Sequence, residues 1–180
     1  MKKLLIIIAV LFAASTQAQV SKVSLQASGL TCSMCSNAIN KSLKSLSYVE
    51  KVMANIQTST FDISFKPGAK VNFDELKKKV EDAGFFVANL SARVQFNNLQ
   101  VQKDEHVNYE GMTMHFLNAN GQVLNGEQTI QVVDKGYVAA KAFKKNQLIT
   151  KMDCYKTGVA GSCCTKEGLP AGSRIFHVTI

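Results

Sequence analysis

Hydrophobic and polar residues alternate along three short segments in the first half of the chain. This period of two is typical of a strand with one buried face, and it covers residues 23–27, 52–56 and 61–65. Two further segments repeat their hydrophobic residues at the spacing of an amphipathic helix. The repeating residues are Ile39, Leu43 and Leu46 in the first segment and Phe73, Leu76, Val80 and Ala83 in the second.

The boundaries of the second helix carry capping residues. Asn72 is a predicted N-cap, Glu75 stands where it would complete a capping box, and Gly84 stands where a helix end favours positive φ. A last strand is expected over Phe85–Val94. The resulting order β-α-β-β-α-β is ferredoxin-like, with both helices on one face of a four-stranded antiparallel sheet. Residues 19–94 are therefore predicted to form one domain.

Short strands separated by turns are predicted after residue 94. Asn120-Gly121 is a strong hairpin signal, and it would join Met112–Leu117 to Val123–Leu124. Further strands are expected at Thr129–Val133, Tyr137–Phe143, Asn146–Met152 and Arg174–Ile180. Residues 139–145 also fit a helical turn. The predicted fold class is α+β, a ferredoxin-like domain followed by a small, mainly β domain over residues 95–180, either a barrel or a sandwich.

The first 18 residues have the pattern of a signal peptide. Lys2 and Lys3 precede the apolar run Leu4–Ala14, and small residues lead to Ala18, where we expect cleavage. The run is shorter than the roughly 20 residues that cross a bilayer as a helix. We therefore expect a soluble periplasmic or secreted protein with no stable membrane insertion.

The net charge of +8 is spread over both halves of the chain. The sequence has no Arg-rich run and no basic patch interleaved with aromatic residues, so nucleic-acid binding is not predicted. No Ser/His/Asp set, carboxylate pair or phosphate-binding loop stands out, so the protein is not expected to be an enzyme.

Two cysteines, Cys32 and Cys35, fall between the first predicted strand and the first predicted helix. The unpaired N–H groups and the positive dipole of a helix start favour thiolates. Two thiolates suit a soft ion of low coordination number such as Cu(I), whereas Zn(II) would lack ligands. The complex with Cu(I) would carry one negative charge, which the helix start offsets.

The stretch GLTCSMC, the helix that follows it and the later step Ala83-Gly84-Phe85 resemble the heavy-metal-associated domain family. The resemblance covers about Val20–Val94. The family includes copper chaperones, amino-terminal domains of copper-pumping ATPases and a periplasmic mercury-scavenging protein. The resemblance implies a metal ion held by Cys32 and Cys35.

Two positions depart from the family pattern. Leu30 replaces a Met that mostly packs beneath the metal loop, and Phe85 replaces a Lys or Tyr that many soluble chaperones place near the metal. The first change should preserve packing. The second removes a positive neighbour, which bears on the chaperone role more than on metal binding.

The predicted function is binding of a soft metal, above all Cu(I), by an exported protein, for sequestration or for transfer to a metal-transporting or metal-accepting protein. Scavenging of Hg(II) or Ag(I) is the nearest alternative, and Zn(II) remains a further candidate ion. A periplasmic thiol-disulfide oxidoreductase and a structural Cys32–Cys35 disulfide are alternatives of other classes.

Met112 and Met114 fall on one face of a predicted strand. With His106 they would make a soft copper or silver site, but two methionines that fill a core are the preferred interpretation.

Three more cysteines, Cys154, Cys163 and Cys164, lie near the carboxyl end. Because adjacent cysteines rarely bond each other, we expect a disulfide from Cys154 to Cys163 or to Cys164. A second thiol-rich metal site, aided by His177 or Met152, is the alternative.

Overall fold

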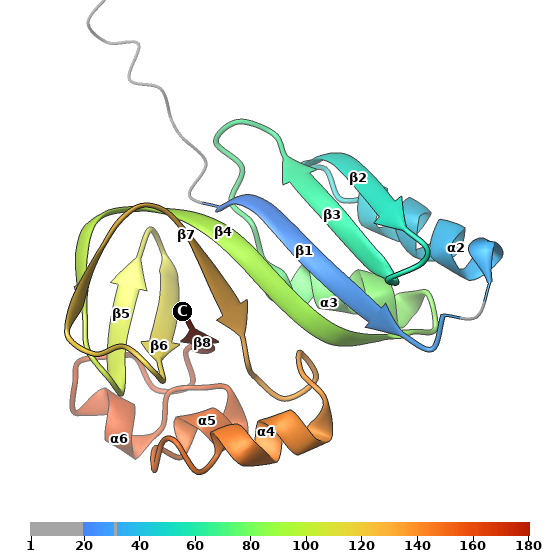
Figure 1. The fold of residues 1–180 in the computed structure, drawn as a ribbon. Helices are drawn as coiled ribbons and strands as arrows, with labels where there is room; N and C mark the ends of the chain where they lie inside the picture. Colours follow the sequence, from blue (N-terminus) through green and yellow to red (C-terminus); the bar gives the residue numbers. More distant parts are fainter. Residues whose placement is uncertain (1–19, 31) are drawn as a thin grey trace, which may run out of the picture.

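The computed structural model describes residues 20–30 and 32–180 of the chain (Figure 1). The predicted signal peptide therefore lies outside the described residues. Within them, no helix is long and apolar enough to cross a membrane.

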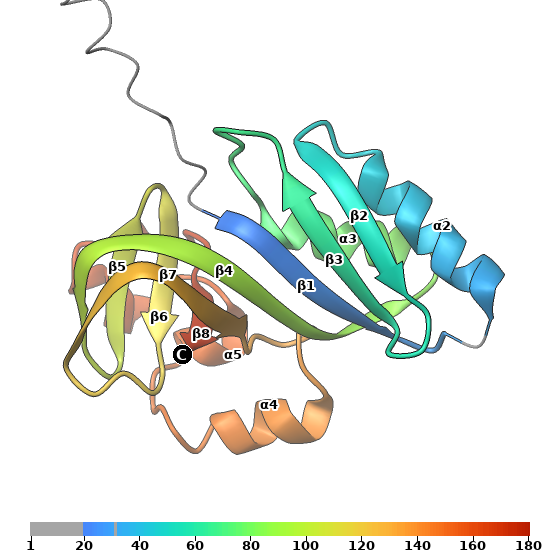
Figure 2. The same cartoon turned by 45° about the horizontal axis from the view of Figure 1, so that its top comes forward.

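The first half has the predicted order of strands and helices. Its elements are β1 (Val20–Ser28), α2 (Ser33–Lys44), β2 (Val49–Asn55), β3 (Thr60–Phe65), α3 (Phe73–Asp82) and β4 (Phe86–Val101). The strands lie in the order β2-β3-β1-β4, and each neighbouring pair is antiparallel. Both helices cover the same face of this part of the sheet (Figures 1 and 2). The ferredoxin-like arrangement is thus present.

Asn72 and Gly84 act as predicted at the two ends of α3, whereas the hydrogen bonds of the described residues include none to the Glu75 side chain that would complete a capping box. The Asn72 side chain accepts hydrogen bonds from the backbone N–H groups of Asp74 and Glu75, at 2.9 and 3.4 Å. Gly84 has a φ of +87°, a conformation that costs glycine little. The apolar stripes of the helices face the sheet, because Ile39 and Leu76 are fully buried in the same core as β1.

Strand β4 runs past the predicted domain boundary at residue 94. Its second part pairs with β7, in a register that extends from Leu90–Val132 to Val101–Gln122. The remaining elements are β5 (Glu105–Tyr109), β6 (Met112–Phe116), β7 (Gln122–Val132), α4 (Ala140–Asn146), α5 (Cys154–Thr157), α6 (Ser162–Thr165) and β8 (Phe176–Thr179). All strands form one eight-stranded sheet, in the order β2-β3-β1-β4-β7-β8-β6-β5.

Several predictions for the second half are wrong. The expected hairpin around Asn120-Gly121 does not form, because β8 lies between β6 and β7 in the sheet. The expected strand at Tyr137–Phe143 is replaced by the start of α4, which fits the alternative helical interpretation, and Asn146–Met152 is not a strand. The separate barrel or sandwich is not confirmed, since the C-terminal strands continue the sheet of the first half.

A hairpin that the sequence analysis missed joins β5 to β6. Glu110 and Gly111 form its turn with φ values of 53° and 84°, and positive φ at both central residues is the signature of a type I′ turn. The turn places His106 opposite His115 in the antiparallel register. Helices α5 and α6 lie close to these strands, at the end of the molecule away from α2 (Figures 1 and 2).

Candidate metal-binding sites

The first candidate site lies at the start of α2. Cys32 is the N-cap residue of this helix and Cys35 belongs to its first turn, as the sequence predicted. Their sulfur atoms are 3.0 Å apart. Cys32 is exposed and Cys35 is partly buried, so the pair is open to solvent on one side.

Local electrostatics favour a thiolate in this pair. The side-chain hydrogen bond from Cys35, supported by backbone N–H groups of Cys35 and Met34, lowers the pKa of the Cys32 thiol. No acidic residue occupies the first turn of α2. The positive end of the helix dipole is therefore left free to stabilise negative charge on the two sulfurs.

Several apolar residues lie near the pair in the chain or in space. Leu30 packs against the main core, which is the role expected of the family's Met. The Phe85 ring lies 3.9 Å from the position that a Cβ on Gly29 would take. Met34 is 81% exposed, so its side chain points to solvent.

The predicted site of Met112, Met114 and His106 does not form. Both methionines are buried in the main core, on the opposite face of β6 from His115. Because His106 pairs with His115 across the hairpin, its side chain lies on that opposite face too. The methionines fill the core, and His106 belongs to a different cluster.

The second candidate site is a row of three histidines across three neighbouring strands. His106 on β5 lies opposite His115 on β6, and His115 lies opposite His177 on β8. Neighbouring ring centroids are 4.5 Å and 4.9 Å apart. These are the only histidines of the chain, and the sheet register brings all three together.

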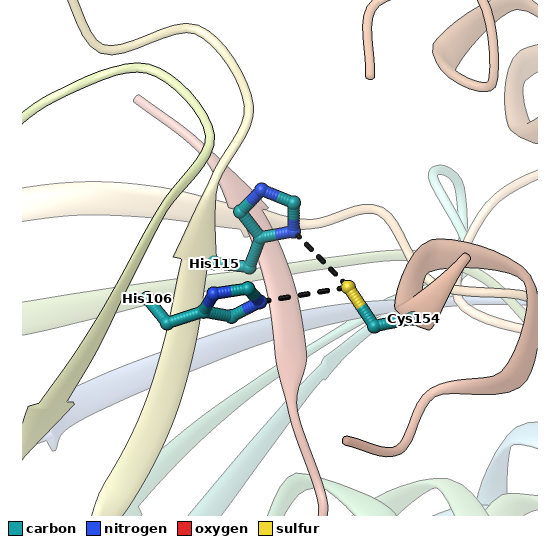
Figure 3. Close-up of side chains that lie close together, drawn as sticks. All are labelled: His106, His115 and Cys154. Carbon is teal, nitrogen blue, oxygen red and sulfur yellow. Dashed lines mark hydrogen bonds between the residues drawn. The ribbon is translucent and has the colours of Figure 1, made fainter. Parts of the chain in front are cut away.

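Cys154, the first residue of α5, faces this row. Its sulfur is 3.5 Å from Nε2 of His106, 3.8 Å from Nδ1 of His115 and 3.4 Å from Nε2 of His177. Figure 3 shows two of these rings, on neighbouring strands, both directed at the sulfur. One thiol thus meets three imidazole nitrogens.

Each imidazole also has a carboxylate at its other nitrogen. Nδ1 of His106 is 2.7 Å from Glu167, and Nε2 of His115 is 3.2 Å from Asp104. Nδ1 of His177 is 2.6 Å from Asp134. Carboxylates in this position orient histidine rings and fix the nitrogen that carries the proton.

The cluster is almost sealed from solvent. His115 and His177 are fully buried, and the side chain of His106 and residue Cys154 are each 1% exposed. Burial, followed by the nearby His177 and His106 rings, lowers the pKa of His115 to about 3, so this ring is neutral at physiological pH. Burial and the neighbouring thiols of Cys164 and Cys163 raise the pKa of the Cys154 thiol.

Cys163 and Cys164 add two thiols beside the cluster. They lie at the start of α6, with their sulfurs 3.3 Å apart, and Cys164 is also 3.6 Å from Nε2 of His106. The sulfurs of these residues and of Cys154 all lie within 4.8 Å of one another. The predicted disulfide from Cys154 is absent, because all five cysteines of the chain lie within the described residues and are free thiols.

The structure thus adds residues that the sequence analysis did not place. His115 was not a predicted ligand, and His177 was only a possible helper of the cysteines. The sequence did contain an indication that His106 and His115 are neighbours. They are equally distant from Glu110-Gly111, so a two-residue turn at this dipeptide would place the two histidines opposite each other. His115 and His177 become neighbours because β6 and β8 pair in parallel. These strands are far apart in the sequence, so no local pattern predicts the pairing.

The antiparallel βαββαβ unit with two thiols at its first helix start belongs to the class of small ferredoxin-like domains. Residues 24–86 match the family model described as the heavy-metal-associated domain. This stretch of the chain is therefore a heavy-metal-associated domain, as the sequence resemblance implied.

Curated relatives match part of the chain. A probable copper-exporting P-type ATPase of Archaeoglobus fulgidus is 31% identical over 97 residues, which are 52% of this chain and 12% of the relative. The cation-transporting ATPase HMA5 of Oryza sativa is 36% identical over 67 residues, or 37% of this chain and 7% of the relative. The chain thus spans only about a tenth of the length of these relatives.

Solved structures also align with this part. The yeast copper transporter domain Ccc2a, studied in apo and Cu(I)-loaded states, is 33% identical and covers 37% of this chain and 90% of its own, with a TM-score of 0.34. Oxidized MerP from Ralstonia metallidurans is 29% identical and covers 38% of this chain and 94% of its own, with a TM-score of 0.35.

Proposed function

We propose that the protein is an exported binding protein for a soft metal ion, Cu(I) before all others, held between Cys32 and Cys35. The observation that carries the proposal is the pair of sulfurs, 3.0 Å apart, at the start of α2 in a heavy-metal-associated domain. Only small movements are needed for both sulfurs to bind one ion. Copper also appears in the name of the Archaeoglobus relative.

The chemistry of the pair supports a soft monovalent ion. Two thiolates satisfy Cu(I), and the uncompensated helix start offsets the negative charge of the complex. The same sulfurs suit Ag(I) and Hg(II), so these ions are the nearest competitors. Zn(II) would need two more ligands, and among the described residues no group of three or more His, Cys, Asp or Glu ligand atoms includes this pair.

The exposure of the pair supports exchange of the ion with another protein. The Cys32 sulfur is open to solvent, so an incoming thiolate can approach the ion before the first ligand leaves. Two exposed apolar side chains form a rim beside the pair. Met34 lies between the two cysteines in the sequence, and Phe86 pairs with Ser28, the last residue of β1. Such a rim suits brief contact with a metal-donating or metal-accepting protein.

The test is a competition for Cu(I) against a chromophoric Cu(I) chelator under anaerobic, reducing conditions. The variant Cys32→Ser/Cys35→Ser should lose at least a hundredfold in Cu(I) affinity at this site. Met34→Ala is the matched control from the same loop, and it should keep the wild-type affinity. Equal affinities of the wild type and the double variant would refute the proposal.

Two further measurements separate the alternatives. Parallel titrations with Ag(I) and Hg(II) rank the ions, and a rank order with Hg(II) far ahead at matched free concentrations would favour scavenging of mercury. Rapid metal-independent turnover of a disulfide substrate would favour an oxidoreductase. Export is tested by the mass of the mature chain from the cell envelope, which should begin at Gln19.

A further inference from the structure

The histidine row and Cys154 bring together more hydrogen-bond acceptors than donors. A neutral imidazole that donates its N–H to a carboxylate carries a lone pair on its other nitrogen. Glu167 and Asp134 face one nitrogen each of His106 and His177, and Asp104 faces one nitrogen of His115. When each ring is neutral, the nitrogen that faces the Cys154 sulfur is therefore an acceptor.

One thiol cannot satisfy three acceptors. An S–H group donates a single hydrogen bond, and the Cys164 thiol, 3.6 Å from Nε2 of His106, can donate one more, so at least one buried imidazole nitrogen would face a sulfur lone pair without a proton between them. Buried polar groups without a partner are costly, and a positive ion at the centre would satisfy all four atoms together. The surrounding carboxylates of Asp104, Asp134 and Glu167 add negative charge that favours a cation.

The sulfur–nitrogen distances match three edges of a tetrahedral coordination sphere. Metal–sulfur and metal–nitrogen bonds of about 2.3 and 2.0–2.1 Å, at tetrahedral angles, separate sulfur from nitrogen by about 3.5 Å. The three sulfur–nitrogen separations around Cys154 are 3.5, 3.8 and 3.4 Å. The Cys154 sulfur therefore already lies at metal-compatible separations from all three imidazole nitrogens, and the ligand atoms of Cys154, His106 and His115 lie within 4.8 Å of one another.

We propose that His106, His115, His177 and Cys154 hold a second metal ion, of the d10 class represented by Zn(II) and Cu(I), in a buried tetrahedral site. Both ions accept three imidazoles and one thiolate. On binding, the thiol proton of Cys154 leaves to solvent and the sulfur becomes a ligand. The site is separate from the Cys32 and Cys35 pair and does not depend on the function proposed for that pair.

The neighbouring cysteines give the ion a path to this buried site. Cys163 is partly exposed, Cys164 is buried next to it, and Cys164 lies 3.6 Å from Nε2 of His106. The thiols therefore form a chain from the surface to the cage. An ion can move along it by successive ligand exchange, without a large opening of the fold.

A cysteine nucleophile is the rival interpretation, because Cys154, His177 and Asp134 also have the order of a catalytic triad. Two observations oppose it. The Cys154 residue is only 1% exposed, so a substrate has no access to the sulfur, and a triad uses one imidazole rather than three. The carboxylates on His106 and His115 have no role in such a triad.

The test uses the full chain with the Cys32→Ser/Cys35→Ser background, so that the first site does not contribute. The reduced, chelator-stripped protein is titrated with Co(II), whose tetrahedral thiolate complexes give intense visible bands and a sulfur-to-metal charge-transfer band. We expect one Co(II) per chain with both features. Absence of the charge-transfer band, or no stoichiometric binding, would overturn the proposal.

Variants then assign the ligands. Cys154→Ser should abolish the charge-transfer band, with circular dichroism to check that the variant folds. Glu167→Gln, on the partly exposed carboxylate that orients His106, should weaken binding 10–100-fold without threatening the fold. The neighbouring surface change Lys166→Gln is its matched control and should leave the affinity unchanged. Equal affinities of these two variants would contradict the assignment.

The resident ion follows from displacement of bound Co(II). Displacement by Zn(II) at lower free concentration than by Cu(I) assigns zinc, and the reverse order assigns copper; either order supports the site. Failure of both ions to displace Co(II), combined with stoichiometric alkylation of Cys154 in the folded protein, would favour the nucleophile and overturn the metal site.

Discussion

Arg174 donates hydrogen bonds from Nε and Nη2 to the two carboxylate oxygens of Asp74, at 2.8 and 3.1 Å. Asp74 belongs to the first turn of α3 in the heavy-metal-associated domain, whereas Arg174 precedes β8 in the C-terminal half. The same guanidinium lies 3.6 Å from Asp134, the carboxylate that holds His177. One side chain thus joins the two halves and borders the histidine cluster.

Replacement of Arg174 with Met should destabilise the protein. The substitution leaves Asp134, which is 3% exposed, without its nearby cation, and removes the paired hydrogen bonds to Asp74. We expect a loss of about 1–3 kcal/mol in the free energy of unfolding, measured by urea denaturation. Lys78→Ala, which breaks the exposed pair with Asp82, is the control and should change stability by less than about 0.5 kcal/mol. Similar losses in both variants would contradict the expected importance of Arg174.

The same contact should make stability depend on pH. Burial raises the pKa of Asp74, but hydrogen bonds from Arg174 and Tyr137 outweigh it and leave the pKa below its ordinary value of 3.8. The unfolded state therefore binds more protons in this range, so stability rises with pH. The contribution is fully present above the unfolded pKa and is lost as pH falls through the lower, folded pKa.

The variant Asp74→Asn isolates this contribution. The difference in unfolding free energy between wild type and variant should be largest above about pH 5 and should shrink towards zero as pH falls below about 3. Urea denaturation at a series of pH values measures it. A difference that stays constant over the whole series would show that the carboxylate charge of Asp74 is not responsible.

Asn72 should be replaceable only by another capping residue. Its side chain satisfies two backbone N–H groups at the start of α3, so Asn72→Ala should cost about 1 kcal/mol in thermal or urea unfolding. Asn72→Asp keeps an acceptor oxygen and adds a charge that suits the helix start, so it should retain the stability. If the Ala and Asp variants are equally stable, the cap does not contribute as described.

Alkylation should distinguish the two clusters of thiols in the metal-free protein. Cys32 is exposed and has a lowered pKa, whereas Cys154 is buried and has a raised one. A brief pulse of iodoacetamide near neutral pH should therefore label Cys32 and spare Cys154, as read by peptide mass mapping. The protein unfolded in urea is the control, in which both should react. Labelling of Cys154 at the rate of Cys32 in the folded protein would show that the cluster opens readily.

The first half could be predicted because each of its signals is local. Alternation defined the strands, and the stripes of Ile39 and Leu76 defined the buried faces of the helices. Asn72 and Gly84 marked the ends of α3. Cys32 and Cys35 are only two residues apart, so their proximity follows from the helix start itself.

The second half lacks such signals. The segment that contains α5 and α6 has helices of only four residues each, which are too short for a visible apolar period. The row of His106, His115 and His177 depends on which strands become neighbours, and β8 inserts between β6 and β7 by a long-range pairing. Asn120-Gly121 favoured a hairpin between β6 and β7, but in the structure β8 lies between these two strands.

The continuity of strand β4 determines how a metal ion could pass between the two candidate sites. This element is one strand of 16 residues, with a register shift between Phe96 and Leu99, and its residues 90–94 pair with β1 on one side and β7 on the other, so the two halves share this part of the sheet. The start of α2 and the region of α5 and α6 lie at opposite ends of the molecule (Figures 1 and 2). Direct exchange of an ion between the ligands of one site and those of the other therefore requires a second copy of the protein. Such a transfer would be bimolecular, with a rate that rises with the square of the protein concentration.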